Sequence, residues 1–183
     1  MEATLIQNAL LYFVLPLWVV AGFADYLCHR KADIEHTAGP KESVIHLMGF
    51  AVVGLPVLAG LFFEINAGVL LLMLAGFILH ELITHWDVVY ANQTREVTPL
   101  EQHVHNYLAL VPLIGLVLAV ILHWPQFLAL FGLGSEAARF AFVLKQNPLP
   151  LWYVGSLLTI IALFDLFPFI EELVRGVRAR KRM

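Results

Sequence analysis

Five long apolar runs, separated by short polar stretches, organise the chain. They cover residues 5–27, 43–63, 67–89, 107–123 and 151–174. Each run approaches or exceeds the roughly 20 residues that a helix needs to cross the hydrocarbon core of a membrane. The pattern predicts an all-α, polytopic membrane helix bundle of about five transmembrane helices, without a separate soluble domain.

This single membrane domain, 1–183, divides into four parts: a first hairpin, a second hairpin, an interfacial segment, and a fifth helix with a basic tail, which cover 1–64, 65–124, 125–150 and 151–183. Within the interfacial segment, 135–144 has the pattern of an amphipathic helix lying at the membrane surface. The first apolar run lacks a basic start and is longer than the core of a signal peptide, so we expect a retained helix.

Composition agrees with a membrane location. The chain is 60% hydrophobic and 14% charged, against about 45–50% and about 25% in soluble domains. Its single cysteine, Cys28, excludes an internal disulfide and a thiolate metal cluster. The only basic run, 175–182, follows an apolar helix as membrane flanks do, so we expect no nucleic-acid partner.

Basic residues also predict the orientation of the bundle. The loops after the first and third runs and the C-terminal tail hold most of them, whereas the other side holds only Arg139 and Lys145. Lysine and arginine accumulate on the cytoplasmic side of membrane proteins. We therefore expect the N-terminus outside and the C-terminus in the cytoplasm, in a membrane such as the bacterial inner membrane.

Most ionisable side chains fall in one layer, near the predicted cytoplasmic ends of the helices. Seven of the eight histidines lie there: His29, His36, His46, His80, His85, His103 and His105. Charged groups within or beside a membrane helix are costly and are usually functional. The layer is therefore the first place to look for a site.

Four carboxylate–histidine pairs in this layer share a spacing of four residues, one pair for each of the first four helices. They are Asp25 with His29, Glu42 with His46, Glu81 with His85, and Glu101 with His105. Four residues turn a helix by about 400°, so the members of a pair lie on one face. Dimetal carboxylate bundles assemble their sites from such inward-facing residues on neighbouring helices.

Two of these pairs belong to an internal repeat. Residues 40–46 and 99–105 share the pattern P-x-E-x-x-(I/V)-H, and each follows a helix that ends in a carboxylate–histidine pair. The pattern predicts two repeated helical hairpins around an axis along the membrane normal, each supplying half of a dimetal site. The prolines suit the first turn of a helix.

Oxygen and imidazole ligands without thiolate suit iron, manganese or zinc. We predict two metal ions, with iron favoured and zinc or manganese as alternatives. For a single pair the alternative is a Glu–His contact without metal, but eight converging groups without a counter-ion would repel one another. An open catalytic site needs free coordination positions, so some of the eight are expected to support the site without binding metal.

Further polar residues are candidates for additional or supporting roles: Glu35, His36, His80, Asp87, His103 and Asp165. His80 and His85 are five residues apart, about 140° around a helix, so they cannot share a metal as the histidines of an HExxH protease do. His103 should point away from the face that carries the pairs. The sequence assigns no catalytic residue.

Acidic residues of the fifth helix have simpler interpretations. Asp165 has no basic residue near it in the sequence, so it either lines a cavity or hydrogen-bonds a neighbouring helix. We expect Glu171 and Glu172 to form a surface ion pair with Arg175, of small energetic value.

At the level of class, this histidine and carboxylate layer resembles the integral-membrane diiron hydroxylases and desaturases. The resemblance covers the four pair-bearing helices and the cytoplasmic placement of the metals. It does not extend to motifs, because those enzymes carry adjacent His-His pairs and none occurs here. Ferritin-like bundles are similar in alternating carboxylate and histidine, although their Glu-x-x-His spacing is one residue shorter.

The resemblance implies a dimetal oxidoreductase, in which oxygen-dependent hydroxylation or desaturation acts on a lipid or another apolar substrate. The chain has no flavin, haem or iron–sulfur motif, so this function requires an external electron donor. One alternative is a dinuclear zinc or manganese hydrolase that cleaves a phosphoester or acyl bond in a lipid. Another is a metal transporter or sensor, which the scarcity of polar residues in the outer half of the helices disfavours.

Overall fold

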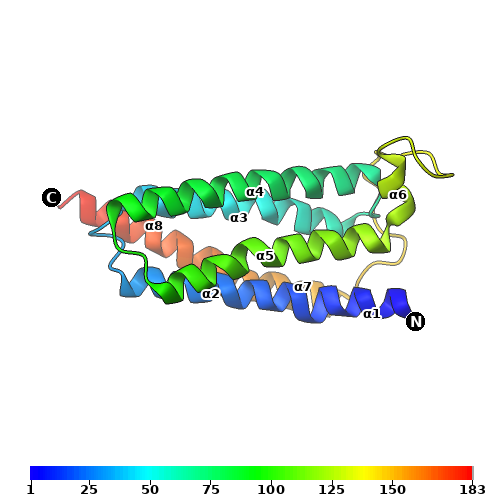
Figure 1. The fold of residues 1–183 in the computed structure, drawn as a ribbon. Helices are drawn as coiled ribbons and strands as arrows, with labels where there is room; N and C mark the ends of the chain where they lie inside the picture. Colours follow the sequence, from blue (N-terminus) through cyan, green and yellow to red (C-terminus); the bar gives the residue numbers. More distant parts are fainter. Residues whose placement is uncertain (183) are drawn as a thin grey trace.

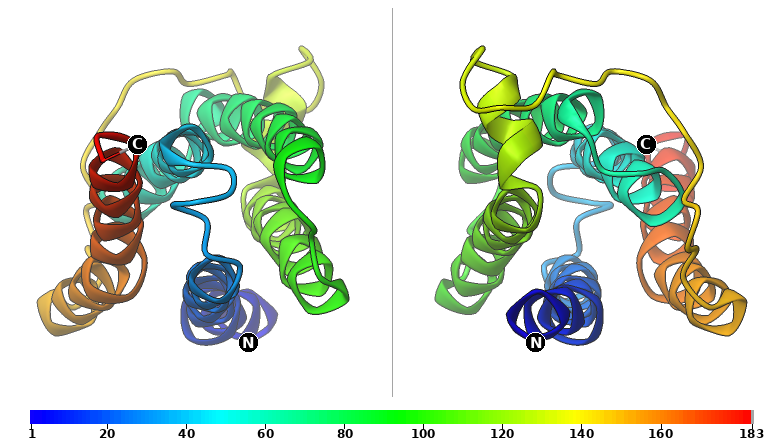
Figure 2. Two further views of the ribbon diagram at one scale, coloured as in Figure 1. Left: turned by 90° about the vertical axis from the view of Figure 1, so that its left-hand side faces the viewer. Right: turned by 90° about the vertical axis from the view of Figure 1, so that its right-hand side faces the viewer.

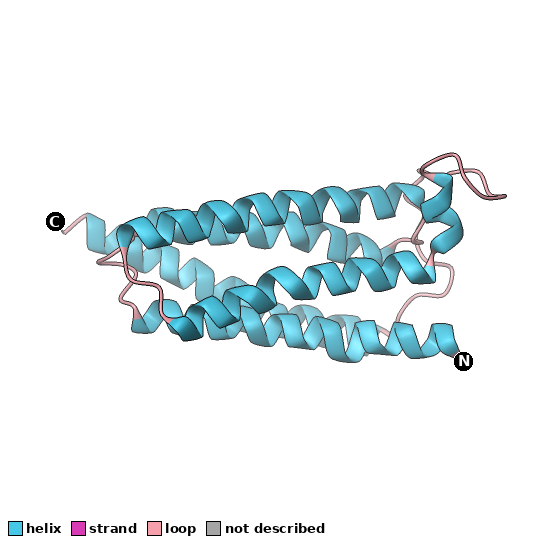
Figure 3. Cartoon of the chain, viewed as in Figure 1, coloured by secondary structure: helices cyan, strands magenta, loops and turns pink. Residues whose placement is uncertain are grey.

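The computed structural model describes residues 1–182 and is helical along most of its length (Figures 1 and 3). Within these residues, five helical rods are long and apolar enough to cross a membrane. The first rod comprises α1 (Glu2–Ala9), the π-helical η1 (Leu10–Val14) and α2 (Leu15–Lys31). The next three rods are α3 (Pro40–Phe62), α4 (Ala67–Thr94) and α5 (Pro99–Leu122). The fifth comprises α7 (Leu151–Ile161), the π-helical η2 (Ala162–Leu166) and α8 (Phe167–Arg180).

Local sequence explains where these helices begin. Pro40 and Pro99 occupy the first turns of α3 and α5, as predicted, where a missing N–H costs nothing. The Thr98 side chain accepts the backbone N–H of Glu101, and the Asn66 side chain accepts two N–H groups at the start of α4. Both Glu42 and Glu101 therefore stand in the first turn of their helices, at the same end of the bundle.

The rods run side by side around a common axis, which Figure 2 shows end-on. α3 packs on α4 and on α8, α5 packs on α2 and α4, and η2 closes against α2. α2 packs mainly on α5 and much less on α3, its neighbour in the chain, whereas α4 packs directly on α5. The two predicted hairpins therefore differ in their internal contacts, although both begin at the same end.

The segment after α6 (Trp124–Ala129) corrects one expectation. Residues 135–144 form no helix. Their backbone groups pair instead with the ends of α3 and α4: Arg139 O accepts the N–H of Gly68 (2.9 Å), and Val143 O accepts that of Glu64 (2.8 Å). Gln126 also accepts the N–H of Arg139. Because these partners satisfy the polar backbone, the segment caps the bundle as an extended strap.

Candidate metal centre

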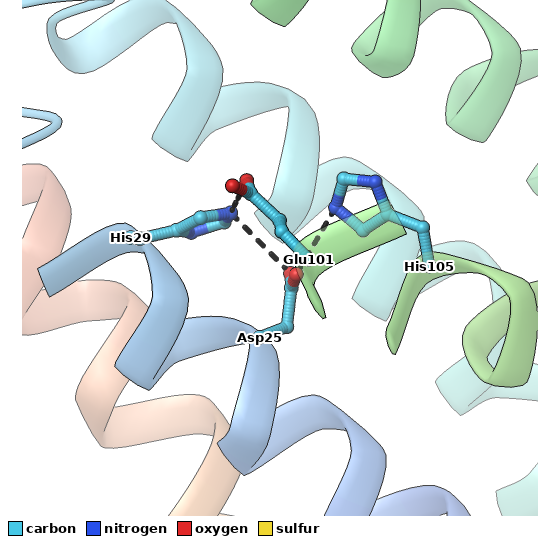
Figure 4. Close-up of side chains that lie close together, drawn as sticks. All are labelled: Asp25, His29, Glu101 and His105. Carbon is cyan, nitrogen blue, oxygen red and sulfur yellow. Dashed lines mark ion pairs between the residues drawn. The ribbon is translucent and has the colours of Figure 1, made fainter. Parts of the chain in front are cut away.

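Polar side chains from several helices converge inside the bundle, at the end where α2 stops and α3 and α5 start. Asp25 and His29 come from α2, and Glu101 and His105 come from α5 (Figure 4). All four are buried within an otherwise apolar bundle. Each pair is four residues apart on its helix, so both members face inward together.

Their spacing suits a metal ion. The Nε2 atom of His29 lies 3.5 Å from Asp25 Oδ2 and 3.6 Å from Glu101 Oε1, and the Nε2 atom of His105 lies 3.0 Å from Asp25 Oδ1. Nitrogen and oxygen ligands bound at about 2.0–2.1 Å in a tetrahedron stand about 3.4 Å apart. These three contacts are close to that separation, and one ligand atom from each of the four residues lies within 4.8 Å of the others, so the group could hold one cation.

Glu172 of α8 orients His29 by contacting the ring nitrogen that is remote from Asp25 and Glu101. Its Oε2 atom lies 3.0 Å from His29 Nδ1, and its Oε1 atom accepts a hydrogen bond from the Ser43 hydroxyl (2.7 Å). With its Nδ1–H donated to Glu172, the imidazole presents the bare Nε2 to Asp25 and Glu101. A carboxylate on the remote ring nitrogen is the usual support of a metal-binding histidine.

A second group of potential ligands comprises His29, Glu42 and His46. His46 stacks on His29 with ring centroids 4.4 Å apart, and its Nε2 lies 2.9 Å from Asp87 Oδ2 on α4. His29 belongs to both groups, but its free Nε2 can serve one ion at a time. A second ion would therefore rest on Glu42 and His46, with a carboxylate shared with the first.

Arg95, in the loop between α4 and α5, joins the two glutamates of the repeat. Its Nη2 donates to Glu42 Oε1 (2.6 Å) and to Glu101 Oε1, and its Nη1 donates to Glu101 Oε2 (3.0 Å). The side chain is only 2% exposed. Burial alone would lower the pKa of the guanidinium, but the bonds to both carboxylates raise it above its usual value, so Arg95 stays charged.

Several buried atoms of the cluster make no well-directed hydrogen bond within residues 1–182, and Asp25 Oδ1 and His105 Nε2 are among them although they lie 3.0 Å apart. They are Asp25 Oδ1, His29 Nε2, His46 Nδ1, Asp87 Oδ1 and His105 Nε2. Each unsatisfied group costs about 1–3 kcal/mol. These atoms are also the donor types that a divalent cation takes, so the cluster could hold a metal ion.

The charges of the buried side chains also favour a bound cation. Five buried carboxylates, Asp25, Glu42, Asp87, Glu101 and Glu172, face a single buried guanidinium, that of Arg95. With neutral histidines, four negative charges stay uncompensated. Two divalent cations would balance them; the alternative is protonation of histidines and carboxylates. The positive charge of Arg95 thus offsets only part of the repulsion among the buried carboxylates that the sequence pattern implies.

The α4 pair does not join this cluster. His85 is exposed, and Glu81 contacts His80 (3.4 Å) rather than the other pairs. Instead α4 turns His80 and Asp87 inward. His80 and Asp87 are seven residues apart and therefore share one face of α4. That face lies about 100° around the helix from Glu81, so α4 cannot turn both faces toward the cluster.

Other predicted residues lie at the edge of the cluster or outside it. His103 is exposed, as predicted from its position on α5. His36 pairs with Asp33 in the exposed loop (2.9 Å), and Glu35 pairs with Arg175 (3.0 Å). Neither loop residue reaches the potential ligand atoms that α2, α3 and α5 supply.

Glu172 and Arg95 lie at the centre of the cluster, although the sequence pattern predicts other roles for them. The expected surface ion pair of Glu172 with Arg175 does not form, because Glu172 is completely buried; its neighbour Glu171 contacts Arg175 instead (3.9 Å). Arg95 was expected only as a charge that sets orientation. A signal for Glu172 existed, because it lies seven residues after Asp165 and therefore on the same helix face. No local pattern marks Arg95.

The cluster borders a cavity of about 300 Å³ whose wall is mostly apolar. Four polar residues of the cluster line it together with His80 and Asp165: Asp25, His46, Asp87 and His105. Asp165 packs so closely against α2 that a Cβ at Gly22 would lie 2.5 Å from Asp165 Oδ1. The molecule thus combines potential metal ligands with a space for an apolar molecule. Comparison of the chain with protein families, curated proteins and solved structures finds no match.

Proposed function

We propose that the chain is a membrane-embedded dimetal oxidoreductase, with iron as the metal, that oxidises an apolar substrate. The observation that carries this proposal is the direct contact between the buried histidine and carboxylate cluster and an apolar cavity. In the proposed orientation, the cluster lies toward the cytoplasm, within reach of a soluble electron donor.

The cavity wall favours oxidation of a hydrocarbon over cleavage of a polar headgroup. Phe50, Leu58 and Ile161 are among the apolar side chains that line the cavity. A phosphate or glycerol headgroup placed there would lose its hydration without gaining hydrogen bonds, at a cost of several kcal/mol. An alkyl chain makes no hydrogen bonds that it would lose on entering, so it avoids this cost.

The proposed reaction is the hydroxylation of a C–H bond. A bound iron pair would supply the chemistry that activates dioxygen. One oxygen atom enters the C–H bond to give an alcohol, and the other leaves as water with two protons and two electrons from a reduced donor protein. Asp25, His29, Glu101 and His105 would hold one ion, Glu42 and His46 would hold the other, and Asp87 and Glu172 would orient the imidazoles.

The test is dioxygen consumption by the purified chain, loaded with ferrous iron and supplied with a chemical reductant and an alkane or fatty acid. Substrate-dependent uptake that gives the hydroxylated product supports the proposal. Zinc-loaded protein is the matched control and should take up no dioxygen. If iron and zinc forms behave alike and the zinc form instead cleaves a lipid ester, the hydrolase reading replaces this one.

A further inference from the structure

A second cavity adjoins the one beside the cluster. It measures about 440 Å³ and shares Leu15, Trp18 and Val57 with the first. The two cavities, which meet at these shared residues, are here called the long chamber. From Asp25 at the cluster to Gln7 at the far end, the first rod advances 18 residues, about 27 Å at 1.5 Å per residue.

This length restricts what can fill the chamber. The hydrocarbon core of a membrane is about 30 Å thick, so the chamber is longer than the roughly 15 Å of hydrocarbon in one leaflet. A molecule that fills the chamber is therefore long and narrow, with an apolar surface along most of its length. The wall of the second cavity agrees, because most of the residues that line it are apolar, among them Leu116, Phe77 and Val111.

The far mouth of the chamber is chemically different, because two basic side chains, His123 and Lys145, line it. The backbone N–H of Lys145 donates to Phe62 O (2.9 Å), which fixes the residue at the end of α3. The negative charge of the Glu64 carboxylate acts on Lys145, and this carboxylate also accepts the backbone N–H of Gln146 (2.8 Å). Lys145 and His123 thus bring two basic groups together at the opening.

Both basic groups bind a proton less readily than they would in water. Burial, and then the positive charge of Lys145, lower the pKa of the His123 imidazole, and the carboxylate of Glu64 opposes this only in part. Burial also lowers the pKa of the Lys145 ammonium, which Glu64 offsets only in part. An anion between them would favour the charged form of each side chain and accept a charge-assisted hydrogen bond from each.

We propose that the long chamber binds a single-chain anionic amphiphile of the long-chain fatty acid class, with its carboxylate between Lys145 and His123 and its tail directed at the metal-ligating cluster. Binding itself needs no metal. The inference rests on the proposed function only in that the tail, and not the carboxyl end, would be the part oxidised.

The head of the ligand is tested with palmitic acid and methyl palmitate, titrated into the metal-free protein in nanodiscs. Lys145→Gln should weaken palmitate binding about tenfold, the loss expected for one charge-assisted hydrogen bond, and leave the ester unchanged. Arg139→Gln removes a basic charge from the same end of the molecule and is the matched control. Equal affinity of the native chain for acid and ester would overturn the assignment of the mouth.

The tail is tested by narrowing the chamber. Gly115 lines the second cavity, and a Cβ there would lie 3.8 Å from Val14 Cγ1, so Gly115→Leu would place its side chain into the chamber. Gly115 is eight residues, about 12 Å, from His123. Gly115→Leu should therefore retain octanoic acid and lose palmitic acid, whereas Gly155→Leu, at an exposed position with open space around it, should retain both.

The outcomes separate this inference from the proposed oxidation. Palmitate binding to metal-free protein that depends on Lys145 and Gly115 supports the chamber, whether or not the iron-loaded protein consumes dioxygen. Palmitate affinity that is unchanged by Gly115→Leu would place the fatty acid outside the chamber and overturn the inference, even if oxidation of another apolar substrate is observed.

Discussion

Glu171 and Glu172 are neighbours on α8 with opposite surroundings. Glu171 is exposed and bonds to Tyr26 and Arg30, whereas Glu172 is fully buried and holds His29 and Ser43. We expect Glu172→Gln to weaken metal binding about 10- to 100-fold, because loss of a carboxylate that orients a ligand histidine has that effect. Glu171→Gln should bind metal as the native chain does. Equal metal affinities of the two variants, measured by competition with a chelator, would contradict the role of Glu172.

The buried ion pairs of Arg95 lead to a second prediction for a single residue. Arg95→Gln removes the guanidinium and leaves Glu42 and Glu101 as facing buried carboxylates, so the metal-free protein should lose about 3–5 kcal/mol of stability. Arg30→Gln breaks an exposed pair with Glu171 and should cost at most about 1 kcal/mol. Thermal unfolding in detergent compares the two. Bound metal should restore part of the loss in Arg95→Gln; a variant as stable as Arg30→Gln would show that the two glutamates do not need Arg95.

At the residue scale, sequence predicts which side chains share a face but not which face points inward. The pairs Asp25–His29 and Glu101–His105 were placed together correctly, because the four-residue spacing is local geometry. The same spacing failed for Glu81, since packing of α4 on α3 turns His80 inward instead. Arg95 reaches the cluster through tertiary contacts that no spacing records.

At the scale of elements, the close approach of α3 and α4 depends on Gly76. A Cβ there would lie 2.5 Å from Pro56 Cγ and 3.1 Å from the backbone oxygen of Val52. Neither a proline ring nor a backbone carbonyl can move away cheaply, so Gly76→Ala should destabilise the protein by about 1–3 kcal/mol. Gly54→Ala, on α3 where nothing lies within 4 Å, is the control and should be neutral or stabilising. If Gly76→Ala has the same unfolding temperature as the native protein, this account of the helix pair is contradicted.

The long helices were also the most predictable elements, because apolar runs of membrane length admit few other structures. The strap at 135–144 was not, since its apolar spacing is compatible with a helix but its backbone partners come from α3 and α4, far away in the sequence. Figure 1 shows this strap beyond α6, at the end of the bundle opposite the cluster.

At the scale of the whole molecule, the distribution of basic residues predicts the orientation in the membrane. The cluster end carries most of them, so we propose that it faces the cytoplasm. In a Cys28→Ala background, Ser135→Cys should react with an impermeant maleimide in intact cells. Thr37→Cys, in the loop between α2 and α3, should react only after permeabilisation. The reverse pattern of labelling would invert the bundle and place the cluster outside.

The central claim is that the buried cluster binds metal, and metal content after anaerobic loading and desalting tests it most directly. His103 and His105 provide the matched pair, two residues apart on α5, one exposed and one buried beside Asp25. The native chain and His103→Ala should each retain about two divalent ions per chain, whereas His105→Ala should lose at least one. A folded native chain that retains no metal, or a His105→Ala variant that retains as much as His103→Ala, would contradict the account.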